Sequence, residues 1–148
     1  MYKHIMLPTD GSRLSGKAIK QGLALARSIG AKVTAINVVP EYQMTMDEGV
    51  VLPASIMLKK RFEQETARHS KTILAAVRSA AQAQGVSCNG VTTSSGRPYD
   101  AIIKEAAKAR CDLIVMASHG RKGLSGILLG SETVKVLTHS RIPVLVVR

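Results

Sequence analysis

The sequence is poor in cysteine, in aromatic residues and in long apolar runs. Its 148 residues include two Cys, one Phe, three Tyr and no Trp. Cys88 and Cys111 are too few for a disulfide framework or a paired-cysteine zinc motif, and we expect both to behave as small core hydrophobes. No apolar run approaches the roughly 20 residues of a membrane span, and the N-terminus lacks the long apolar core of a signal peptide. The sequence therefore predicts a reduced, cytoplasmic protein without a membrane span.

Acidic residues are also scarce. The chain has 10 Asp and Glu against 21 Lys and Arg, so its formal net charge is +11. This balance favours a polyanionic partner, which is nucleotide phosphate, nucleic acid or an anionic membrane surface, unless the charge serves only solubility. Because base stacking requires aromatic side chains, sequence-specific nucleic-acid recognition is disfavoured.

The apolar runs that are present indicate strands. Residues 5–7, 33–39, 113–117 and 144–147 are almost continuously apolar, as in strands covered on both faces, and residues 86–93 form a weaker candidate. Helical patterns lie between them, at residues 12–29, 54–84, 98–109 and 131–139. This alternation predicts one α/β domain, residues 1–148, with an open doubly wound five-stranded parallel sheet and helices on both faces.

Helical spacing also predicts which side chains face the core. In residues 54–84 the expected inward positions are Ile56, Leu74, Val77 and Ala81, and in residues 131–139 they are Val134 and Leu137. The charged run at residues 59–65 is expected to be a solvated face. The long irregular segment at residues 40–53 contains Met44, Met46, Val50, Val51 and Leu52. It is either a partner surface or lid, or a segment packed over the edge of the core.

The densest candidate for ligand binding follows the run at residues 113–117. In parallel sheets ligands bind beyond the carboxyl ends of the strands. The segment after this run contains Gly120, Gly123, Gly126 and Gly130, and a helical pattern then begins at Ser131. Glycines allow close backbone approach, and a helix N-terminus favours phosphate. Arg121 adds positive charge at the rim, while the Ser131 hydroxyl either caps the helix or meets a phosphate oxygen. The segment is not a Walker A loop, and a purely structural turn remains the alternative.

Five motifs in order resemble the nucleotide-binding branch of the universal stress protein family along the whole chain. That branch has Gly-x2-Gly-x9-Gly-Ser/Thr after its fourth strand, and here the spacing is Ala117-x2-Gly120-x9-Gly130-Ser131. The other four motifs are residues 5–12, 96–98, 112–116 and 142–147. Ala117 replaces the first glycine. If that position needs positive φ or the closest backbone approach to the ligand, the methyl group weakens binding about fivefold, and if it is the last strand residue, alanine fits without cost.

The resemblance implies a fold, an assembly and a ligand. The fold is adenine-nucleotide alpha-hydrolase-like with strand order 3-2-1-4-5, and the assembly is a homodimer through residues 142–148, with a tetramer as a further state. The ligand is ATP, with Mg2+ or Mn2+ on its phosphates, although no carboxylate cluster in the sequence marks a metal cage. The implied ATP contacts are Pro8, Thr9, Asp10 and Val38 around the adenosine, Met116 and Ala117 under the ribose, and Gly120, Arg121, Gly123, Gly130, Ser131 and Glu132 at the phosphates.

Three functional hypotheses follow. The first is an ATP-binding regulatory protein of the stress response that acts through a protein partner. The second is a slow ATPase or an autophosphorylating enzyme, against which stands the lack of an evident base: His119 has no paired carboxylate nearby in sequence, so no catalytic residue is assigned. The third is a nucleotide-free interaction module whose basic surface meets an acidic partner.

Overall fold

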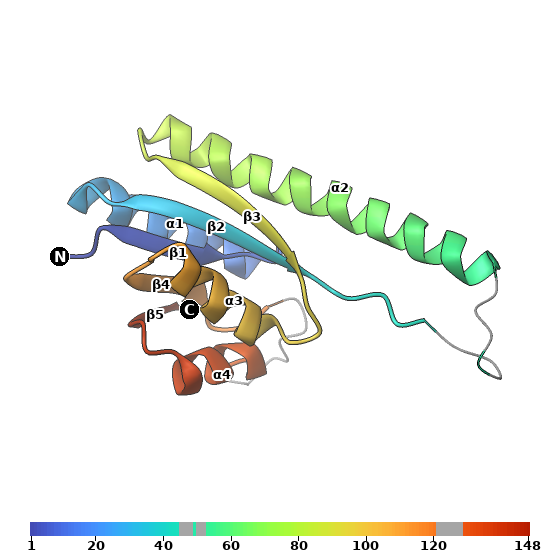
Figure 1. Ribbon diagram of the computed structural model, residues 1–148. Coiled ribbons are helices and arrows are strands. Elements are labelled where there is room, and N and C mark those ends of the chain that lie inside the picture. Colours follow the sequence, from blue (N-terminus) through green and yellow to red (C-terminus); the bar gives the residue numbers. More distant parts are fainter. Residues whose placement is uncertain (45–48, 50–52, 121–128) are drawn as a thin grey trace.

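Five parallel strands alternate with four helices in residues 1–44, 49, 53–120 and 129–148, which are the residues described by the structure, a computed structural model. The strands are β1 (His4–Pro8), β2 (Lys32–Val39), β3 (Cys88–Ser94), β4 (Leu113–Ala117) and β5 (Val144–Val147). The helices are α1 (Arg13–Ile29), α2 (Pro53–Ala83), α3 (Pro98–Lys108) and α4 (Ser131–His139) (Figure 1). Every element begins and ends within two residues of the range that the sequence predicts.

The sheet has the order β3-β2-β1-β4-β5, and every neighbouring pair is parallel. This confirms the predicted fold class and strand order. The central strand β1 pairs with β2 on one side and with β4 on the other. The strand order reverses between β1 and β4, and in such sheets the carboxyl ends at the reversal border a crevice for ligands.

Two apolar layers enclose the sheet. On one face α1 and α2 contribute Leu23 and Leu74 to a core that also contains Leu7 of β1. On the other face α3 and α4 contribute Ile102 and Val136 to a second core, which lies against the opposite side of β1 and β4. Burial on both faces explains why the central strands are nearly continuous apolar runs.

Helix α1 begins and ends at residues suited to those positions. The Ser12 hydroxyl accepts a hydrogen bond from the backbone N–H of Ser15 (3.2 Å) and so caps the first turn. Gly30 ends the helix in the left-handed conformation (φ 69°), which a side chain would strain. The Ser12 cap holds the β1–α1 loop, which lies at the carboxyl end of the sheet, and Gly30 turns the chain toward β2.

At the amino end of the sheet, a carboxylate joins the start of β1 to the start of β4. Asp112 accepts the backbone N–H groups of Lys3 (2.8 Å) and His4 (2.9 Å). Burial alone would raise the pKa of Asp112, but these donors outweigh it and the pKa is lowered. The His4 side chain is buried beside Thr34, and its Nε2 lies 2.8 Å from the threonine hydroxyl. Burial, followed by the charge of Lys32, lowers the pKa of His4.

Three of the predicted inward positions are wrong. Val134 and Leu137 are 43% and 41% exposed, and the buried residues of α4 are instead Thr133 and Val136. The spacing of three residues was predicted correctly, but the buried face is shifted by one residue. Burial of Thr133 is tolerated because its hydroxyl donates to the carbonyl of Ala117 (3.0 Å), so the polar group is satisfied. Ile56 is exposed because it lies in the part of α2 that extends beyond the sheet (Figure 1).

The two cysteines are placed as the sequence predicts. Cys111 is buried and Cys88 is partly buried, and burial, together with the charge of Asp112, raises the pKa of Cys111 to about 11. Both thiols thus pack as small apolar groups, as predicted.

In the part of the chain that the structure describes, no helix is long and apolar enough to cross a membrane. Of the irregular segment 40–53, residues 45–48 and 50–52 lie outside the described residues, and with them Met46, Val50, Val51 and Leu52.

Candidate functional site

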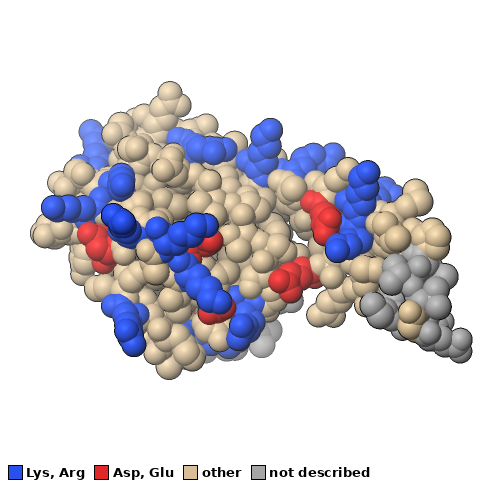
Figure 2. Space-filling view, viewed as in Figure 1, with Lys and Arg blue, Asp and Glu red and all other residues tan. Residues whose placement is uncertain are grey.

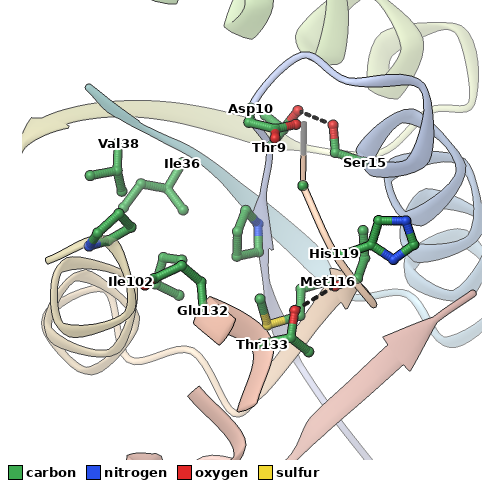
Figure 3. A pocket seen from close by; sticks show the side chains of 14 residues that line it. Thr9, Asp10, Ser15, Ile36, Val38, Ile102, Met116, His119, Glu132 and Thr133 are labelled. Carbon is green, nitrogen blue, oxygen red and sulfur yellow. Dashed lines mark hydrogen bonds between the residues drawn. The ribbon is translucent and has the colours of Figure 1, made fainter. Parts of the chain in front are cut away.

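A cavity of about 220 Å3 opens at the carboxyl ends of β1, β2 and β4, between the β1–α1 loop and helices α3 and α4 (Figure 3). Its walls are mainly apolar, and a few polar groups converge on it, which is the usual composition of a small-molecule site. The predicted site residues that line it are Pro8, Thr9, Asp10, Val38, Met116, Ala117, Gly120 and Glu132. The structure therefore brings together most of the predicted site from four separate segments of the chain.

The β1–α1 loop is held by its own polar groups. Asp10 Oδ1 accepts the backbone N–H of Ser12 (2.9 Å), and the Thr9 backbone N–H donates to the Ile36 carbonyl (2.9 Å). The Thr9 hydroxyl lies 3.1 Å from the Ser15 hydroxyl, in the wall of the cavity (Figure 3). Gly11 adopts φ 75°, which lets the chain turn between β1 and α1. These contacts fix the Asp10 carboxylate at the rim of the cavity.

Gly120 packs directly against Asp10. A methyl group at Gly120 would lie 2.6 Å from Asp10 Oδ2, closer than carbon and oxygen atoms approach without a bond. Any larger residue would displace the carboxylate that the β1–α1 loop positions. The glycine is thus required by the geometry of the two loops.

Ala117 occupies the position where the family pattern has its first glycine. It is the last residue of β4 and pairs with Val147 of β5. Among the described non-glycine residues only Arg110 has positive φ, so Ala117 is in a conformation that any residue adopts. Ala117 is therefore the last strand residue and needs no positive φ, and the expectation that its methyl group leaves the ligand unobstructed stays a prediction.

Gly130 is the N-cap of α4, and its backbone N–H donates to the Ser118 carbonyl (2.7 Å). A methyl group here would lie 2.9 Å from His119 Cβ. Neither Gly130 nor Ser131 lines the cavity. The proposed capping role of Ser131 is wrong: Ser131 is the first residue of the helix, and the cap position carries no side-chain hydrogen bond because it is a glycine.

The side chain of Glu132, a residue that the resemblance places at the phosphates, is bonded within the protein. The carboxylate accepts the backbone N–H of Tyr99 in the first turn of α3 (2.8 Å). It also pairs with Lys135 of α4 (3.0 Å). Glu132 therefore links the N-terminus of α3 to α4, and it lines the cavity on that side.

Several lining residues were missed as site residues by the sequence reasoning. They are Ser15, Ile36, Pro98, Ile102, His119 and Thr133. Ile36 and Ile102 belong to predicted apolar faces, so their burial was anticipated but not their place in a cavity. His119 was considered only as a base, and its Nδ1 lies 3.2 Å from the Ser118 hydroxyl. No local pattern marks Ser15 or Thr133. Arg121 and Gly123 lie outside the described residues.

A second cavity, of about 330 Å3, lies behind the first, between α1 and α2. Thr9 and Ser15 line both cavities. The hydrogen bond between their hydroxyl groups is part of the wall that separates the two.

The comparisons with known proteins decide the family. The family model described as Universal stress protein family matches residues 1–148. The chain belongs to the universal stress protein family. Universal stress protein MJ0531 of Methanocaldococcus jannaschii is 34% identical over 151 residues, which cover 100% of this chain and 83% of that protein.

Solved structures of universal stress proteins share the whole fold. The structure of MJ0577, from the same organism, has a TM-score of 0.85 at 28% identity and covers 99% of this chain and 96% of its own. A universal stress protein solved in complex with cAMP has a TM-score of 0.71 at 24% identity, with 99% and 97% covered. At that identity the likeness to the cAMP complex establishes the fold alone.

Proposed function

We propose that this universal stress protein binds ATP at the carboxyl end of its sheet and acts, as a cytoplasmic homodimer, through a protein partner that responds to the bound nucleotide. The observation that carries the proposal is the contact of Gly120 with Asp10 at the rim of an apolar cavity. The Asp10 carboxylate and the backbone of Gly120, which has no side chain, lie side by side where the strand order reverses, between β1 and β4.

The adenosine would occupy the cavity. Val38, Met116 and Ile102 offer apolar surface for the base, while the Asp10 carboxylate can accept hydrogen bonds from ribose hydroxyl groups. Universal stress proteins of this fold have been solved with cAMP, dAMP and AMP, which share the adenine nucleoside with ATP. The cavity of this chain, at the carboxyl end of the sheet, is where we propose that an adenine nucleotide binds.

The phosphates would lie beyond Gly120, toward the N-terminus of α4. The first hydrogen bond within α4 is donated by Val134 to the Gly130 carbonyl. The N–H groups of Ser131 and Glu132 precede it, so they are the donors that a helix N-terminus offers to an anion. Gly130 itself would contribute shape rather than a donor, because its N–H is bonded to Ser118.

A Mg2+ or Mn2+ ion would be held mainly by the phosphate oxygens. Within the described residues no group of three or more His, Cys, Asp and Glu side chains could hold a metal ion. Glu132, the carboxylate on the α4 side, is already bonded to Tyr99 and Lys135. The ion would then neutralise phosphate charge without a dedicated protein cage.

The dimer would form through β5 and its flanking residues, 142–148. β5 is an edge strand of the sheet, and Leu145 is 44% exposed on it. An exposed edge strand offers backbone groups that a second copy can pair with, and a tetramer would be a pair of such dimers. Light scattering of the purified protein tests this: Leu145→Lys should shift the mass toward the monomer, whereas Lys104→Gln on α3 should not.

Titration calorimetry with ATP on nucleotide-free protein tests the ligand. Micromolar binding is expected, with about tenfold weaker binding in Gly120→Ala because the methyl group displaces Asp10. Gly16→Ala is the matched control, since a methyl group at Gly16 meets no atom within 4 Å. AMP and cAMP titrations would show which phosphate pattern binds most tightly.

Two results would count against the proposal. Absence of binding heat at millimolar ATP would remove the nucleotide from the function. Equal weakening in Gly16→Ala and Gly120→Ala would mean that affinity follows overall stability and not the contact with Asp10. Mass spectrometry of the ligand released on denaturation would identify any nucleotide that co-purifies.

A further inference from the structure

The first half of α2 extends beyond the carboxyl ends of the strands (Figure 1). The buried residues of α2 begin at Ser70, so none of residues 53–69, here named the α2 arm, is buried. The arm is braced by Tyr42, whose ring centroid lies 5.4 Å from that of Phe62. Two ion pairs along the helix, Lys59–Glu63 and Arg61–Glu65, add local support. Packing against the core therefore does not explain the residues at the end of the arm.

The end of the arm carries three consecutive large apolar residues, Ile56, Met57 and Leu58, here named the apolar tip. Their exposed fractions are 56%, 74% and 56%. Successive helical residues point about 100° apart, so the three side chains cover more than half of the helix circumference. A helix that binds in a protein groove buries a stripe with a spacing of three to four residues. A helix end that enters an apolar phase buries all three adjacent residues at once.

The next turn of the arm is basic. Lys59, Lys60 and Arg61 follow the apolar tip directly, and residues 53–61 contain no Asp or Glu. Within the described residues Lys60 makes no ion pair. The N-terminal end of a helix is itself electropositive, so cations there are unfavourable unless anions lie close.

The surrounding surface has the same sign. Lys and Arg side chains outnumber Asp and Glu on the face shown in Figure 2, in keeping with the net charge of +11. An apolar turn with a basic turn about 5 Å behind it matches the order of acyl chains and anionic headgroups in a bilayer. The charge and the apolar tip thus favour the same partner.

We propose that the α2 arm docks on anionic lipid surfaces, with the apolar tip entering the acyl boundary and the basic turn meeting the phosphate headgroups. No residue of the arm lines the nucleotide cavity, although Phe62, Glu65, Thr66 and His69 line a neighbouring cavity together with Asp10 and Val38. β5 lies at the opposite edge of the sheet from β3, against which α2 packs, so dimer formation through β5 leaves the arm accessible. One apolar turn gives only weak, reversible binding, and Lys60 is, among the described residues, the cation of the basic turn that is not shared with a glutamate of the arm.

Co-sedimentation of the full chain with vesicles tests the proposal. Vesicles of phosphatidylcholine with about 30% phosphatidylglycerol should bind the protein at least tenfold more tightly than pure phosphatidylcholine, and added salt should weaken the binding. Met57→Gln/Leu58→Gln should weaken it about tenfold. The matched control is Val134→Gln/Leu137→Gln, which removes two similarly exposed apolar residues from α4. Lys60→Glu should also weaken it, and more than Lys20→Glu on α1.

The absence of tryptophan provides a second readout. In Met57→Trp the only tryptophan marks the apolar tip, and its emission should shift to shorter wavelength when anionic vesicles are added. In Leu137→Trp, with the reporter on α4, the emission should stay unchanged.

Three outcomes would overturn the proposal: no binding to anionic vesicles, equal losses in the arm and α4 variants, or unshifted tryptophan emission from vesicle-bound Met57→Trp protein. A fourth is loss of self-association in Met57→Gln/Leu58→Gln, measured by light scattering without lipid. That result would assign the apolar tip to a contact with a second copy of this chain.

Discussion

Asp112 at the amino end of the sheet and Asp10 at its carboxyl end both accept backbone N–H groups, and Asp10 borders the candidate ligand cavity. Asp112 joins the start of β1 to the start of β4 through Lys3 and His4. Asp10 accepts Ser12 within its own loop and lies against Gly120. The Asp112 carboxylate thus joins segments that are distant in sequence, whereas the Asp10 carboxylate lies beside the candidate ligand site. The comparison indicates that stability and binding are separated along the strand direction of one sheet.

The largest expected effects come from substitutions that remove each of the two carboxylates in turn. Asp112→Ala should lower the free energy of unfolding by about 2 kcal/mol, because it leaves two backbone donors without their acceptor. Asp10→Ala should lower it by less than about 1 kcal/mol while weakening ATP binding. Urea unfolding of both variants measures the first effect, and calorimetry measures the second. Equal losses of stability would contradict the comparison.

Acidification should affect the amino end next. The folded pKa of His4 is lowered, so the unfolded chain binds more protons as the pH falls below about 6.5. The contribution of His4 to stability is thus complete above that pH and declines toward its folded pKa, by at most about 1.4 kcal/mol per pH unit. The lowered pKa of Asp112 acts only near and below its ordinary value of 3.8. Unfolding between pH 7.5 and 5.5 should therefore isolate His4.

Two histidine variants sharpen the pH experiment. His4→Gln should flatten the stability profile between these pH values. His139→Gln, at an exposed position on α4, should leave its slope as in the parent. A slope that persists in His4→Gln would assign the effect to another group.

The smallest expected effect lies at the carboxyl end. Ala117→Gly restores the family glycine, yet it should change ATP affinity by less than about twofold, since Ala117 is ordinary strand backbone. The free energy of unfolding should fall by about 0.5–1 kcal/mol because glycine is unfavourable in a strand. A gain in affinity beyond about tenfold would show that the methyl group obstructs the ligand.

Much of the fold could be predicted because it depends on local pattern. Strands buried on both faces are continuous apolar runs, and Ser12 and Gly30 mark the ends of α1. The phase of α4 could not be predicted. Its buried face includes Thr133, whose burial depends on a carbonyl 16 residues earlier in the chain. The spacing of apolar residues in the sequence does not predict this hydrogen bond between Thr133 and Ala117.

The candidate site was predictable in outline for a similar reason. The carboxyl ends of β1, β2 and β4 must converge once the strand order is known, and this assembles Asp10, Val38 and Gly120. The side-chain role of Glu132 depends on a contact between two helices, and the place of Ser15 depends on its contact with Thr9 of the β1–α1 loop; hydrophobic patterning predicts neither contact. The link between Asp112 and His4, 108 residues apart, was likewise hidden.

The hydroxyl pair of Thr9 and Ser15 has a consequence for chemical probes. The two hydroxyl groups, 3.1 Å apart, border both the cavity at the strand ends and the one between α1 and α2. A nucleoside analogue that carries a small branch toward this hydroxyl pair would extend toward the second cavity. Since the second space is lined by residues of α1 and α2, such a compound would distinguish members of this family by their helices even where their nucleotide contacts are the same.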